Sequence, residues 1–213
     1  RDVPPRPVLE RKPEVLGVSF FGDWCDPGIM REQQFRILNV AHKNEFRPKP
    51  HTLIFLTKQA EEQAVTLAAW QSLSTTYPSL SLPHSWFGVS VTCQKDADER
   101  IPHLLGTPAA HRWISAEPLV GAVNLTNIAP REDWHIDALD CPDRSLSLDL
   151  VIAGGESGPN ACPMDEDWMR SLRDQCASAQ VPFYYKQNSG LHPEHLPLLD
   201  GVRHDALPWR NEP

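Results

Sequence analysis

Polar and charged side chains follow closely on each of six apolar segments of the chain. Lys58 and Lys186 are cations, and Asp23, Glu117 and Glu156 are carboxylates. Groups of both signs gathered at one place can bind anionic groups, hold a cation or transfer protons. They also perturb each other's pKa values, as groups at functional sites often do. The complete set of candidates is Asp23, Lys58, Thr92, Gln94, Glu117, Glu156, Ser157, Lys186 and Gln187.

Within this set we expect two kinds of role. Glu117, Glu156 and Lys186 are the catalytic candidates, because carboxylates and lysines can exchange protons with a substrate. The other members, together with Gly154 and Gly155, are expected to bind a substrate or cofactor. These two glycines serve either a tight turn or the close approach of a ligand. One polar residue at the end of a strand is explained by surface exposure alone, whereas a row of them over six segments favours a site.

The elements that must position these residues alternate along the chain. The apolar segments are short and contain many β-branched or aromatic residues, which predicts strands, and helical apolar stripes separate most of them. Pro102 weakens the prediction of a regular third helix. Strands that alternate with helices imply parallel pairing in chain order, and hence a complete or partial (β/α) TIM-like barrel, with an open doubly wound sheet as the alternative. The predicted strands are 15–22, 52–56, 86–91, 111–115, 150–153 and 181–185. In either fold, their carboxyl ends lie at one edge, where the candidates would gather.

Length and composition indicate one globular domain. The chain has 213 residues and a net charge of −8, which argues against broad binding of nucleic acid. No apolar segment approaches the roughly 18 residues of a membrane span, and a cytoplasmic location is expected. We expect an extended lead-in at 1–14, a barrel-like domain at 15–190 with a polar surface insertion at 129–148, and a C-terminal tail at 191–213 that packs on the domain, with Trp209 as an anchor.

No metal site is predicted from the cysteines and histidines. The five cysteines form no CxxC pair, which indicates reduced thiols rather than disulfides or a zinc site. The histidines lack the spacing of metal ligands and are expected to be surface or capping groups. Cys93 follows a predicted strand, but an inert thiol is the simpler interpretation. No glycine-rich nucleotide fingerprint, GxGxxG or GxxxxGK[ST], is present.

Several short motifs occur together in a familiar order. They are FLTK (55–58), WFGVSVT (86–92), ISAEPL (114–119), GGESG (154–158) and PFYYKQ (182–187). In this combination the chain resembles the phage protein Gp thirty-seven/sixty-eight family, a domain of unknown function. That family in turn resembles the radical S-adenosylmethionine barrels, and its members usually carry an upstream Cys-rich loop that resembles an iron–sulfur cluster site.

The resemblance implies a radical S-adenosylmethionine-like enzyme of which this chain, without an initiator Met, is a fragment. The cluster would come from a missing upstream segment, because the cysteine spacing here does not suit a cluster loop. We therefore expect this chain alone to bind no cluster, whereas a longer parent would bind a cluster and S-adenosylmethionine. The resemblance also implies that Gly154–Glu156 contacts the methionine amino group, although the segment lies on a late strand.

Two other functions remain open at this point. One is a non-catalytic phage accessory or binding protein on the same scaffold. The other is a cluster-free barrel enzyme that uses Glu117 and Glu156 as an acid/base pair. All three functions imply a small-molecule or cofactor ligand and no membrane, and the sequence leaves the oligomeric state open.

Overall fold

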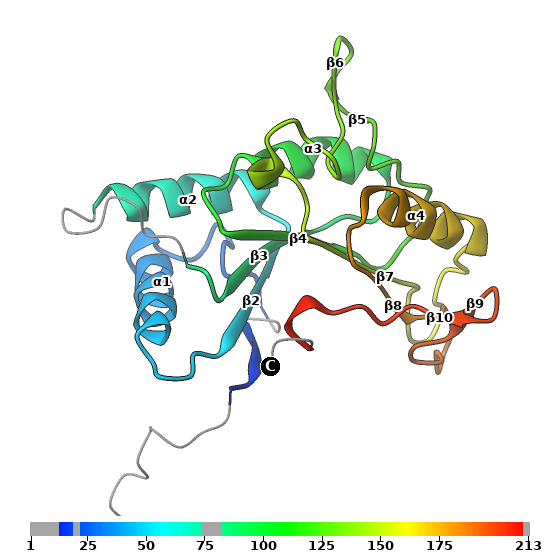
Figure 1. The fold of residues 1–213 in the computed structure, drawn as a ribbon, viewed down its shortest axis with the longest axis horizontal. Coiled ribbons are helices and arrows are strands. Elements are labelled where there is room, and N and C mark those ends of the chain that lie inside the picture. Colours follow the sequence, from blue (N-terminus) through cyan, green and yellow to red (C-terminus); the bar gives the residue numbers. More distant parts are fainter. Residues whose placement is uncertain (1–12, 19–21, 74–81, 211–213) are drawn as a thin grey trace, which may run out of the picture.

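The computed structural model describes residues 13–18, 22–73 and 82–210, and its centre is a six-stranded parallel sheet (Figure 1). The sheet order is β1-β2-β3-β4-β7-β8, and every neighbouring pair is parallel. The strands are β1 (Val15–Val18), β2 (Thr52–Thr57), β3 (Ser85–Ser90), β4 (His111–Ala116), β7 (Leu150–Gly154) and β8 (Phe183–Gln187). The sheet curls into a half-barrel, which confirms the predicted partial barrel and strand order. A doubly wound sheet would require the order to reverse at a switch point, and it does not.

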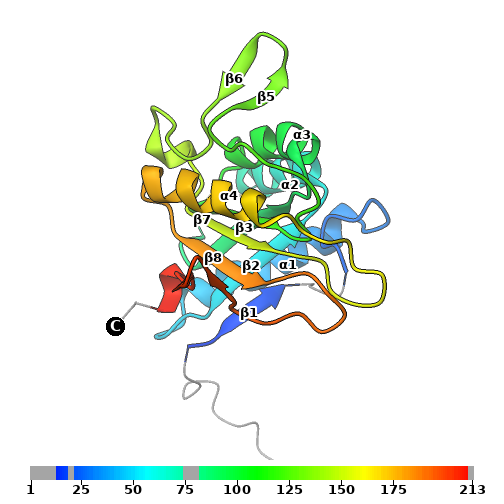
Figure 2. The ribbon, with the colours of Figure 1, turned by 90° about the vertical axis from the view of Figure 1, so that its right-hand side faces the viewer.

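Four helices cover the convex face of the sheet (Figures 1 and 2). They are α1 (Arg31–Glu45), α2 (Ala60–Ser72), α3 (Gln94–Leu105) and α4 (Glu166–Ala179). Each turns an apolar stripe toward the sheet; Leu38, Leu67, Ile101 and Leu172, one from each helix, are almost completely buried. Helix α3 continues through Pro102, three residues before its end, so this proline does not break it.

Successive side chains of a strand point to opposite faces, so the sheet has a helix-covered face and a concave face. Phe55, Phe87 and Val151 point toward the helices and are fully buried. Ile54, Trp86, Trp113 and Leu150 belong to a separate cluster that also contains Leu207 from the C-terminal tail. Figure 1 shows this tail running back beneath the sheet from the β9–β10 hairpin, on the side that carries no helix.

The boundaries of the first and last strands differ from the prediction. Strand β1 ends at Val18, and residues 19–21 of the predicted strand lie outside the described residues. The last strand was predicted at 181–185 but begins at Phe183, because the Val181 N–H donates to the Cys176 carbonyl of α4 and so ends the helix. Lys186 therefore lies within the strand instead of after it.

The predicted insertion at 129–148 has more structure than expected. Its first half forms an antiparallel hairpin of β5 (Ile128–Arg131) and β6 (Trp134–Ile136), which projects from the body in Figures 1 and 2. Its second half contains a short 3-10 turn, η2 (Arg144–Leu146), and buries Leu139 in the main core. Because this segment is rich in polar residues, the sequence did not indicate that it packs against the core.

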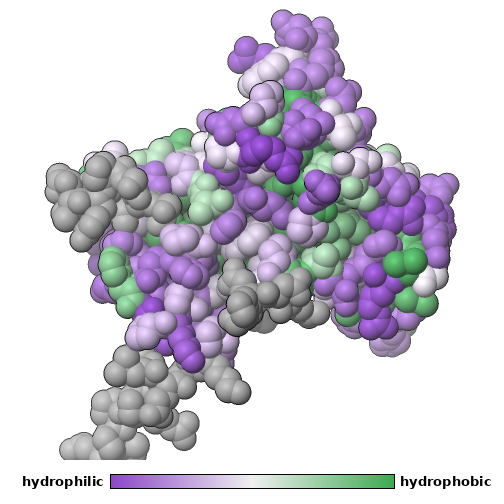
Figure 3. Space-filling model, in the orientation of Figure 1, coloured by the Kyte–Doolittle hydropathy of each residue, from purple (hydrophilic) through white to green (hydrophobic). Residues whose placement is uncertain are grey.

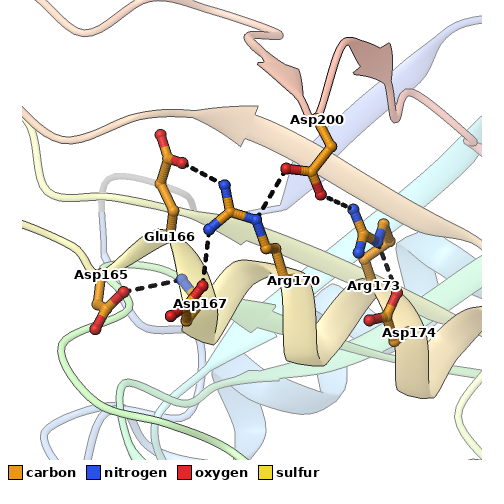
Figure 4. Close-up of polar contacts among 7 residues, drawn as sticks. All are labelled: Asp165, Glu166, Asp167, Arg170, Arg173, Asp174 and Asp200. Carbon is orange, nitrogen blue, oxygen red and sulfur yellow. Dashed lines mark hydrogen bonds and ion pairs between the residues drawn. The ribbon is translucent and has the colours of Figure 1, made fainter.

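The C-terminal tail forms the hairpin of β9 (Leu198–Leu199) and β10 (Val202–Arg203) and ends in the 3-10 turn η3 (Pro208–Arg210). Two ion pairs attach the hairpin to α4, because Asp200 accepts from Arg170 Nε at 2.9 Å and from Arg173 Nη1 at 2.6 Å (Figure 4). These two hydrogen bonds hold the pKa of Asp200 below its usual value. The tail is therefore fixed at its hairpin before it reaches the concave face.

The surface in the view of Figure 3 is mostly hydrophilic, and hydrophobic residues show in several places, among them the β9–β10 hairpin. Leu198 and Val202 are the exposed apolar side chains there. Within the described residues, no helix is long and apolar enough to cross a membrane.

Candidate functional site

A cavity of about 460 Å³ lies on the concave face toward the carboxyl ends of the strands; we call it the upper cavity. Its walls are mostly apolar away from the strand ends, and its polar groups lie near the carboxyl ends of the strands. The lining residues are Ile54, Leu56, Ser90, Trp113, Ser115, Glu117, Ile152, Tyr184, Lys186, His195, Leu207 and Trp209. Ligand sites in proteins have this volume and this mixture of apolar walls with a few polar groups.

An ion pair between Glu117 and Lys186 forms the polar end of the upper cavity. The Lys186 Nζ donates to both carboxylate oxygens of Glu117 at 2.9 Å, although the residues are 69 positions apart. The Glu117 side chain is 17% exposed and that of Lys186 is 45% exposed. Among the described residues, neither side chain has another hydrogen-bond partner. The pair is therefore partly dehydrated and faces the cavity without further support.

Gly154 of β7 lies between the strands that carry these two charges. A Cβ atom added to Gly154 would lie 3.5 Å from the Glu117 carboxyl carbon, so the pair closes directly over this glycine. Ala153 and Gly154 are adjacent on β7, but their partners on β8, Tyr185 and Gln187, are two positions apart. Lys186 lies between these partners and is the extra residue of a β-bulge. Bulges redirect side chains next to functional sites.

The indole of Trp113 forms the floor of the upper cavity. It lies on Gly88 of the neighbouring strand, where an added Cβ would be only 2.4 Å from the ring atoms Cε2 and Nε1. Its Nε1–H donates to the carbonyls of Phe55 at 3.1 Å and Trp86 at 3.3 Å. The ring is therefore held flat against the sheet.

The other candidates on the first half of the sheet support the backbone and do not line the upper cavity. Asp23 accepts from the Thr57 hydroxyl, from Cys25 N at 3.0 Å and from Lys58 N at 2.9 Å, and so ties the end of β2 to the preceding loop. The Lys58 side chain is exposed. Neither Asp23 nor Lys58 is among the residues that line the cavity.

Thr92 and Gln94 hold the start of helix α3. The Thr92 N–H and hydroxyl both donate to Asp96, at 3.0 and 2.6 Å. Gln94 accepts from Asn124 N at 2.6 Å and donates to Asp98 at 2.8 Å. Their hydrogen bonds are thus made within the fold, outside the cavity lining.

The Gly-Gly-Glu-Ser segment after β7 is also engaged with neighbouring backbone. Glu156 accepts from Cys162 N at 2.9 Å, and the exposed Ser157 forms a bridge with Gly190. A Cβ on Gly155 would lie 2.5 Å from the Ser189 backbone nitrogen, so this glycine permits two backbones to approach closely.

Gln187, the last of the sequence candidates, is buried and supports the same region. Its side chain donates to the Gly155 carbonyl at 3.0 Å. Of the four charges predicted from sequence to converge, the structure therefore brings Glu117 and Lys186 together in the cavity, and Lys58 and Glu156 lie elsewhere.

A model of the family described as "Protein of unknown function (DUF5131)" matches residues 4–208, which is nearly the whole chain. The chain belongs to the DUF5131 family. No match was found among curated proteins or among solved structures. The phage family inferred from the short motifs is thereby confirmed.

The thiols of this DUF5131 chain do not gather into a ligand set. All five cysteines are free, and Cys25, Cys141 and Cys176 are buried. Burial raises the pKa of all three, that of Cys176 to about 12, which disfavours the reactive thiolate form. Within the described residues, no three His, Cys, Asp or Glu side chains are grouped so that they could hold a metal ion.

Several residues that line the upper cavity were not among the candidates from the sequence. Ser115 and Tyr184 lie two positions before Glu117 and Lys186, so strand alternation could have indicated both. His195 reaches the site because the tail pairs with β8, where Leu196 N donates to the Lys186 carbonyl at 2.8 Å. No local sequence signal predicts that contact.

Proposed function

We propose that the chain binds a small molecule in the upper cavity and that Glu117 and Lys186 hold its charged groups. The observation that carries this proposal is an ion pair between distant parts of the chain at the end of an otherwise largely apolar cavity. Ion pairs contribute little net stability, only about 0–1 kcal/mol when they are exposed, and the cost of desolvation offsets their attraction when they are buried. Folding alone therefore gives little reason to place two charges there.

The ion pair favours a ligand that carries both an ammonium and a carboxylate group. Such a ligand can take its ammonium to Glu117 and its carboxylate to Lys186, so that every charge keeps a partner. A simple anion would instead leave Glu117 unpaired in a largely buried position, which is unfavourable. The apolar walls formed by Ile54, Leu56 and Ile152 suit an apolar body attached to these charges.

The resemblance to radical S-adenosylmethionine barrels agrees with this ligand class, because the methionyl end of that cofactor carries both groups. The described cysteines and histidines do not fit a cluster, since they are dispersed over the fold. The function proposed for this chain is therefore binding of the zwitterionic group, without a radical step.

A non-catalytic binding role on the same scaffold is the second candidate. The observation that favours it is that the charges of Glu117 and Lys186 are paired with each other. An acid/base pair of Glu117 and Glu156 has less support, because Glu156 bonds to a loop N–H and does not line the cavity. Binding without turnover of any amino-acid-type ligand would favour the binding role.

Titration calorimetry with L-norleucine, n-pentylamine and hexanoate tests the charge requirement, and S-adenosylmethionine tests the resemblance. We expect the amino acid to bind more tightly than either single-charge analogue. Glu117→Gln and Lys186→Met should each weaken its binding by roughly tenfold to a hundredfold, the usual worth of a hydrogen bond to a charged group. The matched control is Glu32→Gln, which breaks an exposed ion pair with Arg36 on helix α1.

The outcome for each variant is distinct. Equal binding of all three compounds, or unchanged binding by Glu117→Gln, would refute the proposal. If Lys58→Gln or Glu156→Gln weakened ligand binding as much as Glu117→Gln does, the four charges predicted from sequence would act together in binding, and not the Glu117–Lys186 pair alone.

The arrangement of the cysteines leads to a prediction about iron–sulfur cluster binding. We expect anaerobic reconstitution of this chain with iron and sulfide to leave no stoichiometric cluster, because the free cysteines lie on separate elements and three are buried. Iron and sulfide analysis with the absorption spectrum is the measurement. A stable cluster that is lost in Cys93→Ser or Cys162→Ser would contradict this expectation.

A further inference from the structure

A second cavity of about 280 Å³ lies on the same concave face, toward the amino ends of the strands; we call it the lower cavity. Aromatic rings and prolines form most of its wall, and Trp86 stacks on His111 with ring centroids 4.3 Å apart. The lining residues are Thr52, Pro83, His84, Trp86, His111, Asp149, Pro182, Pro208 and Trp209.

The two cavities belong to one groove along the sheet. Residues two apart on a strand point to the same face. On β2 and on β4, the earlier residue of such a pair lines the lower cavity and the later residue lines the upper cavity. Thr52 lines the lower cavity and Ile54 the upper; His111 lines the lower and Trp113 the upper. The groove therefore continues from the lower cavity to the ion pair.

Trp209 separates the two cavities, because it lines both of them. Its ring meets Trp86 edge-to-face, with centroids 5.1 Å apart. It belongs to η3, in the tail segment that crosses the concave face after pairing with β8, where Tyr185 N donates to His204 O at 2.8 Å. The tail thus places one aromatic side chain across the groove.

We propose that Trp209 determines ligand length: it ends the upper cavity and excludes amino-acid-type ligands whose apolar chain would extend into the lower cavity. The inference rests on the proposed function, since it takes the Glu117–Lys186 pair as the anchor of the ligand. The apolar chain of an anchored ligand points away from the strand ends, along Ile54 and Trp113, toward the indole of Trp209. Removing that indole joins the two cavities.

The test is calorimetric binding of L-norleucine, α-aminooctanoic, α-aminodecanoic and α-aminododecanoic acids to the wild type, Trp209→Ala and Trp209→Phe. Affinity should rise about fourfold per buried methylene until the chain meets Trp209, and should then fall for longer members, which the indole excludes. In Trp209→Ala the rise should continue to longer members, and in Trp209→Phe the limit should move by a smaller amount. Leu198→Ala, on the exposed side of the β9–β10 hairpin, is the control and should keep the wild-type limit.

Thermal unfolding of each variant shows whether it is folded, and Trp209→Phe decides the question if the alanine variant is not. An unchanged length limit in a folded Trp209 variant overturns the inference and leaves the proposed function intact. Failure of every amino acid to bind the wild type overturns the proposed function, and the inference with it.

Discussion

Gly155→Ala is expected to lower the free energy of unfolding by about 1–3 kcal/mol or more, the usual range for overpacking. The added Cβ would lie 2.5 Å from Ser189 N and 2.8 Å from Ser189 Cα, and these backbone atoms cannot rotate away. The strand end would have to shift, which disturbs the hydrogen bond from Gly155 N to Gln187 O. Urea unfolding followed by circular dichroism measures the loss.

The neighbouring glycine provides the matched control. A Cβ on Gly154 would make ordinary contacts of 3.4 Å with Gln187 and 3.5 Å with Glu117. Gly154→Ala should therefore change stability by less than about 1 kcal/mol, with some gain from reduced freedom of the unfolded chain. If both variants lose the same stability, close approach to Ser189 is not the reason for the glycine at 155.

Gly88→Ala is expected to have a comparable or larger effect, because the clash lies inside the sheet. The new methyl would overlap the Trp113 ring, which would have to leave its place and lose its hydrogen bonds to Phe55 O and Trp86 O. A displaced indole can move only toward the upper cavity. We expect about 1–3 kcal/mol of lost stability or more, together with loss of ligand binding.

Gly106→Ala is the matched control for Gly88→Ala. Its Cβ would lie 3.5 Å from the Pro102 carbonyl, an ordinary contact at the end of helix α3. Its ligand affinity should match the wild type. Norleucine binding to Gly88→Ala at wild-type affinity, measured at a temperature where it is folded, would show that the Trp113 platform does not shape the cavity.

The sequence predicts the half-barrel well because its strands are apolar on both faces and are separated by helical stripes. A segment such as 52–56 is short and apolar and is followed by a helical stripe, a pattern typical of a parallel βα unit. The same reasoning predicts that Glu117 and Lys186 lie at the edge formed by the carboxyl ends of the strands, and the structure pairs them.

The rest of the site could not be predicted, because strand-end position does not say where a side chain points. Asp23 and Glu156 follow strands as Glu117 does, yet their carboxylates accept backbone N–H groups of adjacent loops. His195 enters through tertiary packing of the tail, for which the sequence has no periodic signal, and Trp209 is predicted only as an anchor of the tail and not as a residue of the site. Local patterns determine which edge a residue reaches, and long-range contacts determine its partner.

The bulge at Lys186 makes the site depend on the number of residues in the last strand as well as on their types. Deleting one residue between Phe183 and Lys186 would rotate the following side chains to the opposite face, because side chains alternate with a period of two. The lysine would then point toward the helices and away from Glu117. Relatives that keep this lysine but differ by one residue in the strand would therefore lack the pair, and an alignment that places a gap there would hide the difference.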